Sequence, residues 1–433
     1  MARKRRTAST WALLGAFILL APWVAQGTAV AAPRWSEQDL ASTDRVGLTL
    51  DSGALRLDAT EDLGASSRLD ATVRRTGSAT FPEQELEAPT DVIDVTMDTT
   101  GDQGRISTEA RGGRSDGMWT EWYPLGAEEG RVVFPETVIR VQLRIEMSSF
   151  EQDADVSITG VRVRPAENSE VAKENGASAK IDDVPRPYSA RLFATRIGLV
   201  GGTTANGHVV RPDDHFVALP SRRGLATRGG GEYTVRVCGT GELGPEASGE
   251  TEGHTPRCAY LPVWDVGPWN IDDDHWNEER QSWRGLERGR PQAEAAYTEG
   301  YNGGLDGFGR RVRNPAGIDL ADGAFEQGLR LPTNGWVQVD YLWTAQYRER
   351  AEITTATGKD PVIVRTGPGT HHDIVGSAAH KANVDVSCQV SGDSVTGPEG
   401  TSDLWYRIGE GHYVPAAFAQ GGSQAPRCST DRP

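Results

Sequence analysis

The residues best suited to chemistry lie in one short stretch, LPVWDVGPWNIDDDHW, which covers 261–276. An apolar run ends there in a carboxylate, Asp265, and Val266-Gly267-Pro268 then turns the chain. Three indoles accompany that carboxylate: Trp264, Trp269 and Trp276. Carboxyl groups transfer protons, and flat indole rings pack against the C–H faces of sugar rings. The stretch therefore predicts a saccharide-binding wall beside an acid.

A second carboxylate lies downstream, in the segment Ile318-Asp319-Leu320-Ala321. We expect Asp319 to open a short helix whose apolar face continues at Phe325 and Leu329. Two carboxyl groups cannot both ionise easily where a fold brings them together, and one then keeps a proton for acid catalysis. Each also has a structural alternative, because Asp265 would cap its own turn and Asp319 the helix. The residues alone leave both interpretations open.

The run Asp272-Asp273-Asp274-His275 raises the question of a metal site. It lacks the alternating acidic spacing of a calcium loop. Consecutive carboxylates are more typical of a solvated loop. No Ser-His-Asp or Cys-His grouping can be assembled from local motifs. We therefore expect a solvated loop at 272–275, and neither a metal nor a cofactor.

The N-terminus predicts export. Four basic residues at 3–6 precede an apolar run, and Ala29-Val30-Ala31 offers a cleavage site, so 1–31 is predicted to be a signal peptide. Its removal leaves 41 basic and 61 acidic residues, a net charge of −20. Such a surface repels nucleic acids and anionic lipids, so we expect neither as a partner. We expect a monomer that is secreted, either extracellular or associated with the cell wall.

Four cysteines remain after that cleavage: Cys238, Cys258, Cys388 and Cys428. Four cysteines allow three pairings, and an oxidising compartment favours disulfides. The residues fall in two separate regions of the chain. The simplest prediction therefore pairs Cys238 with Cys258 and Cys388 with Cys428.

Strand patterns divide the mature chain. Residues 35–165 alternate apolar and polar side chains, as in VIRVQLRIEM at 138–147, which predicts a β-sandwich. Residues 166–186 have a linker composition without aromatic side chains. Two further units, at 187–345 and 350–430, contain short strand patterns. The predicted fold class is mainly β.

The middle unit carries three motifs in order: Thr204-Ala205-Asn206-Gly207, Asp265-Val266-Gly267-Pro268 and Ile318-Asp319-Leu320. Together they resemble the double-psi β-barrel of rare lipoprotein A and the expansin-like group over about 190–343. The resemblance implies a central six-stranded double-psi β-barrel with insertions. It also implies a groove lined by Thr204, Asn206 and the two carboxylates.

The flanking units show their own resemblances. The strand and turn ending at Arg365-Thr366-Gly367-Pro368-Gly369, with Trp405 and Val414 in the closing strands, resemble a bacterial SH3-like β-barrel. Members of that family commonly bind peptidoglycan. The stretch DGMWTEWYPL at 116–125 resembles the N-terminal β-domain of secreted actinobacterial peptidoglycan amidases, whose zinc-binding catalytic domain is absent here.

These resemblances imply a cell-wall protein that binds peptidoglycan or another wall polysaccharide. In lytic relatives the Ile-Asp-Leu aspartate is the general acid, which assigns that role to Asp319, with Asp265 beside it. Catalytic relatives also carry a histidine where this chain has Leu219. The function therefore stays open between a glycan-cleaving enzyme (a lytic transglycosylase or a glycoside hydrolase) and a non-catalytic, expansin-like wall-binding or interaction protein.

Overall fold

The computed structural model describes residues 33–58, 72–101, 104–126, 130–150, 156–166, 186–247, 249–250 and 255–429. The predicted signal peptide lies outside these residues, as does most of the predicted linker. Residues Arg34–Pro433 form one compact unit, which is mainly β, as predicted. Across the described residues no helix has the length and apolar character needed to cross a membrane.

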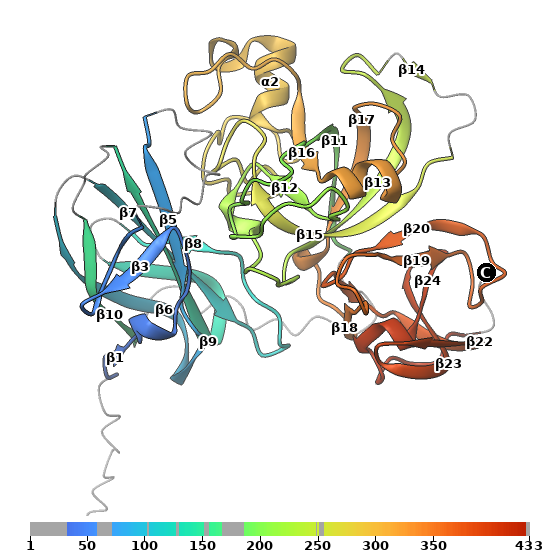
Figure 1. Ribbon diagram of the computed structural model, residues 1–433, viewed down its shortest axis with the longest axis horizontal. Coiled ribbons are helices and arrows are strands. Elements are labelled where there is room, and N and C mark those ends of the chain that lie inside the picture. The colour runs from blue at the N-terminus through green and yellow to red at the C-terminus, as the bar shows by residue number, and fades with distance from the viewer. Residues whose placement is uncertain are drawn as a thin grey trace, which may run out of the picture. The chain divides into compact units, whose positions relative to one another are not determined.

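The N-terminal part is an antiparallel sheet, blue to teal in Figure 1. Its described strands are β1 (Ser36–Glu37), β2 (Asp44–Val46), β3 (Leu48–Asp51), β4 (Ala54–Leu57), β5 (Arg75–Thr80), β6 (Gln84–Thr100), β7 (Gly104–Gly113), β8 (Tyr123–Pro124), β9 (Arg131–Ser149) and β10 (Ser157–Ala166). The long strand β9 pairs with β6 through its first half and with β5 and β7 through its second half. Because its partners change along its length, the sheet folds over a shared apolar core.

Six strands of the middle part close into a barrel. They are β11 (Tyr188–Arg196), β12 (Val217–Leu219), β13 (Thr234–Leu243), β15 (Cys258–Val266), β16 (Ala316–Leu320) and β17 (Gly335–Tyr341). They pair in the order β13-β17-β11-β16-β12-β15, and β15 returns to β13. The pairs β11–β16 and β12–β15 are parallel, and the other four are antiparallel. The predicted closed six-stranded barrel is therefore present, and β14 (Gly249–Glu250) extends it beside β13.

The segment between β15 and β16 is the long insertion, which we define as residues 269–313. It contains α2 (Gln292–Glu299), whose last turn is closed by Gly300 in the left-handed conformation that glycine adopts without steric cost. A 3-10 turn at Tyr301–Gly304 follows. The other described helical turns lie elsewhere, at Leu40–Ser42, Arg222–Gly224, Ala324–Gly328, Leu342–Thr344 and Ala416–Phe418.

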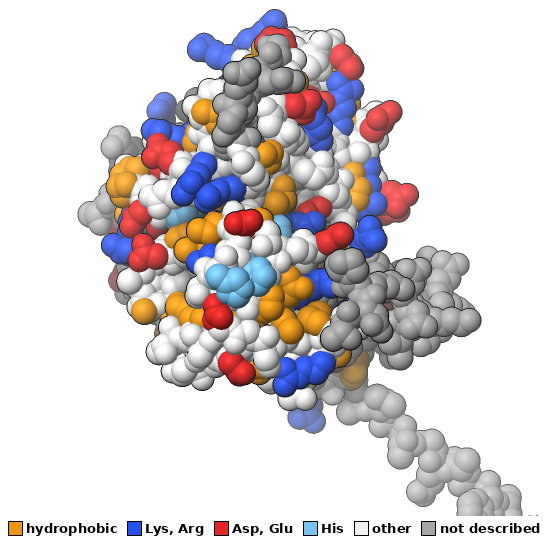
Figure 2. Space-filling view, turned by 90° about the vertical axis from the view of Figure 1, so that its right-hand side faces the viewer, with side chains coloured by type: hydrophobic (Ala, Val, Ile, Leu, Met, Phe, Trp, Pro, Cys, Tyr) orange, Lys and Arg blue, Asp and Glu red, His pale blue; other side chains and the backbone are white. Residues whose placement is uncertain are grey.

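The C-terminal part, orange to red in Figure 1, has a smaller apolar core. Its strands are β18 (Arg350–Ile353), β19 (Val362–Arg365), β20 (Ile374–Ala378), β21 (Asn383–Asp385), β22 (Cys388–Gly397), β23 (Gly400–Gly409), β24 (His412–Pro415) and β25 (Ala419–Gly421). Trp405 is 1% exposed and belongs to the interior. Figure 2 shows a face on which histidine side chains gather beside apolar ones.

The C-terminal part is joined to the barrel by a strand pair. Strand β20 runs parallel to β15, with Cys258 opposite Gly376. Both predicted disulfides are present, Cys238–Cys258 within the barrel and Cys388–Cys428 within the C-terminal part. Cys238 and Cys258 are direct cross-strand partners, which places their Cα atoms 4.0 Å apart.

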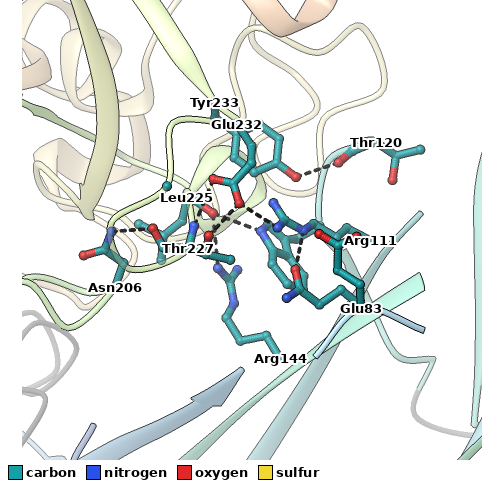
Figure 3. A network of polar contacts seen from close by, with 12 residues as sticks. Glu83, Arg111, Thr120, Arg144, Asn206, Leu225, Thr227, Glu232 and Tyr233 are labelled. Atoms are coloured by element: carbon teal, nitrogen blue, oxygen red, sulfur yellow. Dashed lines mark hydrogen bonds and ion pairs between the residues drawn. The ribbon is translucent and has the colours of Figure 1, made fainter. Parts of the chain in front are cut away.

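The N-terminal sheet contributes side chains to the barrel core. Trp122, which is fully buried, packs in the barrel's apolar cluster and donates its Nε1–H to the Leu225 carbonyl. Arg111, from β7, donates to the Glu232 carboxylate over 2.7 Å, and the Tyr233 hydroxyl donates to the Thr120 carbonyl (Figure 3). The two parts therefore share one interior.

Candidate functional site

A cleft of about 420 Å³ opens at one end of the barrel. Its polar lining includes both predicted carboxylates, Asp265 and Asp319, together with Thr195. Trp269 and Arg310, from the long insertion, form part of the wall. The parallel pairing of β11 with β16 brings Thr195 beside Asp319, and β12 brings Asp319 near Asp265 because it pairs with both β16 and β15.

The strand register sets the spacing of the two carboxylates. Ala218 on β12 is the cross-strand partner of Asp265 on β15 and also of Asp319 on β16. Residues in register point to the same face of a sheet, and neighbouring strands lie about 4.8 Å apart. The two aspartate Cα atoms are therefore separated by about 9.5 Å, twice that strand spacing. Ala218, with its short side chain, lies between them and lines the cleft.

Asp319 is the carboxyl group prepared to keep a proton. Burial raises its pKa to about 7, and the nearby Asp265 adds to the rise, while a hydrogen bond donated by the Thr195 hydroxyl opposes it. Thr195 is in register with Asp319 on β11, so the sheet itself positions this donor. An acid with a pKa near neutrality both holds and releases a proton under physiological conditions.

The predicted helix start at Asp319 is wrong. Asp319 is the penultimate residue of strand β16, and the helical turn begins later, at Ala324. The parallel pairing with β11 extends through Leu320, which keeps the backbone extended at this point. Asp319 is therefore not a helix cap.

Asp265 is held from the opposite side of the cleft. It is 2% exposed, and its Oδ1 accepts the Ala205 N–H over 2.8 Å. This bond ties the end of β15 to the turn at 204–207. Asp265 thus combines a structural contact with an electrostatic effect on Asp319.

Trp269 supplies the aromatic wall. Its ring is half-buried, and its Nε1–H donates to the Asn314 Oδ1 over 3.0 Å. The guanidinium of Arg310 lies 5.8 Å from the ring centroid and donates to the Trp269 carbonyl. The backbone of Trp269 is left-handed, with φ of 64°, a conformation that costs a non-glycine residue free energy. The ring is therefore fixed in its orientation beside the cleft.

The other predicted binding residues are not in the cleft lining. Trp264 is 7% exposed and stacks on Phe216 in the barrel core. Trp276 is fully buried and packs against Tyr341. Neither indole therefore offers a free face to a sugar.

The predicted turn residues stabilise their own turn. The Thr204 hydroxyl donates to the Asn206 Oδ1 over 2.7 Å and accepts from the His208 N–H. The Asn206 side chain donates to the Thr227 carbonyl. Thr204 is fully buried, and the described cleft lining includes neither residue. Their link to the site runs through the Ala205 N–H bonded to Asp265.

The expectation of a solvated loop at 272–275 is also wrong. Asp273, Asp274 and His275 are fully buried. Asp273 pairs with Arg280 and accepts the Gln292 N–H, while Asp274 pairs with Arg223 over 3.0 Å. The insertion folds over these carboxylates, so their charges are neutralised by arginines. The described residues contain no group of three or more potential ligands arranged for a metal ion.

Five polar residues of the cleft lining were not predicted from the sequence: Thr195, Arg196, Arg310, Asn314 and Asn334. Thr195 follows the apolar run of β11, and a polar residue at a strand end was an available signal. Arg310 and Asn314 lie in and just beyond the insertion, whose path no local pattern specifies. Leu219, at the position of the relatives' histidine, is fully buried in the barrel core.

Comparisons with known proteins describe parts of the chain. Residues 188–340, which include the barrel and the insertion, match a family model described as a domain of unknown function (DUF8814). The uncharacterized protein YraJ of Bacillus subtilis (strain 168) is 39% identical over 56 residues, which is 13% of this chain and 47% of YraJ. The uncharacterized protein YraI of the same strain is 31% identical over 88 residues, 18% of this chain and 73% of YraI. The chain belongs to the YraI family. It spans about half the length of YraJ, and neither the YraI nor the YraJ name states an activity.

Proposed function

We propose that this is a secreted cell-wall protein whose cleft binds a glycan strand of peptidoglycan or a related polysaccharide. The observation that carries the proposal is the pairing of Asp319, a carboxyl that holds its proton near neutral pH, with the fixed indole of Trp269 in one cleft. An acid beside an aromatic wall is the arrangement that a glycosidic bond requires for both binding and leaving-group protonation.

The proposed chemistry begins at Asp319. Its carboxyl proton passes to the glycosidic oxygen, the bond from C1 to that oxygen breaks, and the leaving sugar departs with a new hydroxyl. A hydroxyl of the muramic acid then attacks C1 and returns its proton to the Asp319 carboxylate. This transglycosylase route needs one acid/base, and Asp265 contributes charge and positioning rather than proton transfer.

Hydrolysis is the second route. An inverting hydrolase needs a second carboxylate about 6.5–9.5 Å from the acid to activate water. The strand register places Asp265 and Asp319 on either side of Ala218 in the same cleft, as two cooperating carboxylates would need to be. Asp265 is, however, only 2% exposed, and its Oδ1 already accepts the Ala205 N–H, which leaves little room for it to position a water. The single-acid route therefore has more support.

A binding role without cleavage is the second candidate function. Leu219 replaces the histidine of catalytic rare lipoprotein A relatives, and its side chain lies in the barrel core rather than in the cleft. The groove would then act as expansin-like proteins do, by attachment alone. The Trp269 wall supports binding equally well in either case.

The flanking parts support a cell-wall setting. The motifs at Arg365–Gly369 and at Trp405 and Val414 lie on the β19 turn and on the paired strands β23 and β24, compatible with an SH3-like unit. Two disulfides fit an oxidising compartment outside the cell. We therefore propose that the C-terminal part attaches to wall material while the barrel cleft engages the glycan.

The test incubates the mature protein with purified sacculi and measures both pelleting and soluble muropeptides. We expect the protein to pellet and to release anhydro-muropeptides, and Asp319→Asn to keep pelleting but release nothing. Asp213→Asn is the matched control, because it is a partly buried barrel aspartate outside the cleft lining. Pelleting without release would assign the binding role alone, and failure to pellet would overturn the proposal.

A further inference from the structure

A second cavity, of about 410 Å³, lies at the insertion. It is lined by Ile271, Asp272, Ser282, Trp283, Gly307 and Phe308. Its volume falls within the usual range for small-molecule sites. The insertion thus contributes to two cavities, because Trp269 and Arg310 belong to the cleft. We call this second space the insertion cavity.

The insertion cavity combines aromatic faces with hydroxyl-binding groups. Trp283 and Phe308 are both half-buried, so part of each ring is accessible. Asp272 Oδ2 accepts from the Ser282 hydroxyl, and Asp272 Oδ1 accepts no hydrogen bond from the described residues. A pyranose has C–H faces that stack on aromatic rings and hydroxyl groups that donate to a carboxylate oxygen. The insertion cavity offers both kinds of contact.

The backbone holds Trp283 in an unfavourable conformation. Its φ is 59°, in the left-handed region that a residue with a Cβ rarely adopts. Trp269, in the cleft wall, shares this feature with φ of 64°. Residues kept in such conformations concentrate at ligand-binding sites, where the surrounding structure enforces an orientation. Each cavity therefore has one indole that is carried by a backbone in this conformation.

A single arginine connects the two cavities. The guanidinium of Arg310 lies 5.8 Å from the Trp269 ring centroid and 5.3 Å from that of Phe308. Trp269 lines the cleft and Phe308 lines the insertion cavity. The Asn270 Oδ1 also accepts the Gly307 N–H over 2.8 Å, which holds the two walls together. The cavities are therefore neighbours along one rigid wall.

We propose that the insertion cavity is a second saccharide subsite, which binds more distant rings of the glycan strand that occupies the cleft. This inference rests on the proposed glycan binding. It adds that the ligand has several linked rings, because the cleft and the insertion cavity are separate spaces that each take a different part of it. Trp283 is the stacking residue of this subsite, and Asp272 accepts from a sugar hydroxyl.

The test measures dissociation constants of the mature protein for soluble β-1,4-linked N-acetylglucosamine oligomers of increasing length. We expect wild-type affinity to rise with length until both cavities are filled. Trp283→Ala should leave affinity for the shortest binding oligomer unchanged and weaken the longest about tenfold, the value of one lost stacking contact. Trp283→Phe should restore most of the loss.

Controls separate this subsite from the cleft and from folding. Trp269→Ala should weaken oligomers of every length, and Trp35→Ala, which removes an exposed indole from the N-terminal sheet, should weaken none. The thermal midpoint of Trp283→Ala shows whether the variant is folded, and Trp283→Gly, which tolerates positive φ, repeats the test if it is not.

Two negative outcomes are distinguishable. In the first, wild type and Trp283→Ala have equal affinity for oligomers of every length, while Trp269→Ala binds more weakly. This result would overturn the second subsite and leave the proposal of glycan binding intact. The second subsite is overturned in the same way if Trp283→Ala weakens short and long oligomers equally. If wild type binds no oligomer and no sacculi, the proposed function itself fails.

Discussion

Asp265 and Asp319 lie in register on opposite sides of Ala218, one on β15 and the other on β16. One strand therefore sets the distance between the two carboxylates of the cleft. The environments differ, because Asp265 accepts the Ala205 N–H while Asp319 accepts from the Thr195 hydroxyl and has a raised pKa. The two carboxyl groups therefore have different roles, Asp319 as the proposed proton donor and Asp265 as its electrostatic neighbour.

The pH dependence of stability should reveal the proton that Asp319 holds in the folded state. Its folded pKa of about 7 exceeds the ordinary value of 3.8, so between these values the folded state binds more protons than the unfolded state. This stabilisation is present at low pH and is lost as pH rises towards 7. The Asp319→Asn variant has no carboxyl to titrate at this position. Its free energy of unfolding minus that of wild type should therefore increase with pH, by at most about 1.4 kcal/mol per pH unit. Chemical denaturation at pH 5 and pH 8 measures the difference, and an equal difference at both would contradict the raised pKa.

Asp265 should control the acidity of Asp319. Asp265→Asn removes a negative charge while keeping an oxygen that accepts the Ala205 N–H. The pKa of Asp319 should then fall, because repulsion by Asp265 is one cause of its rise. Carboxyl NMR titration of selectively labelled protein measures this shift directly. Glu326→Gln provides the control, because it removes the charge of an exposed residue that is not in the cleft lining. It should leave the Asp319 titration unchanged.

Glu121 should couple the N-terminal sheet to the barrel. Its carboxylate accepts the Nε1–H groups of Trp276 and Trp343 over 2.6 and 2.9 Å, and a hydrogen from the Asn277 amide. Glu121→Ala leaves these buried donors without an acceptor, which should lower the free energy of unfolding by about 3 kcal/mol or more. Thermal unfolding should show a lower midpoint, whereas Glu87→Ala, at an exposed position of β6, should leave the midpoint unchanged. A loss confined to one of two separate transitions would argue against a shared interior.

The two disulfides should contribute by restricting the unfolded chain. Cys388–Cys428 closes the longer loop, with a sequence separation of 40 against 20 for Cys238–Cys258. Chain entropy gives about 4 kcal/mol for the longer loop and about 3 kcal/mol for the shorter. Double serine variants of each pair, compared by denaturant unfolding, measure both losses. Peptide mapping without reductant checks the pairing, and any bond across the two pairs would contradict it.

Several features followed from the sequence because their determinants are local. Period-two alternation at 138–147 predicted a strand, and the segment lies within β9, where the polar side chains of Gln142 and Arg144 are buried as well. The separation of the cysteines into two regions predicted both disulfides. The end of β15 and the turn after Asp265 were also recognisable from neighbouring residues alone.

The tertiary structure alone decided which residues face the cleft. Trp264 lies on β15, a strand buried on both faces, so alternation could not tell its core position from that of a wall residue. Asp273 and Asp274 looked solvated because their partners, Arg280 and Arg223, are chosen by the folding of the insertion. Asp319 became a strand residue because pairing with β11 outweighed the local helix signal. In each case a contact between distant segments determined the environment, and no local pattern encodes such contacts.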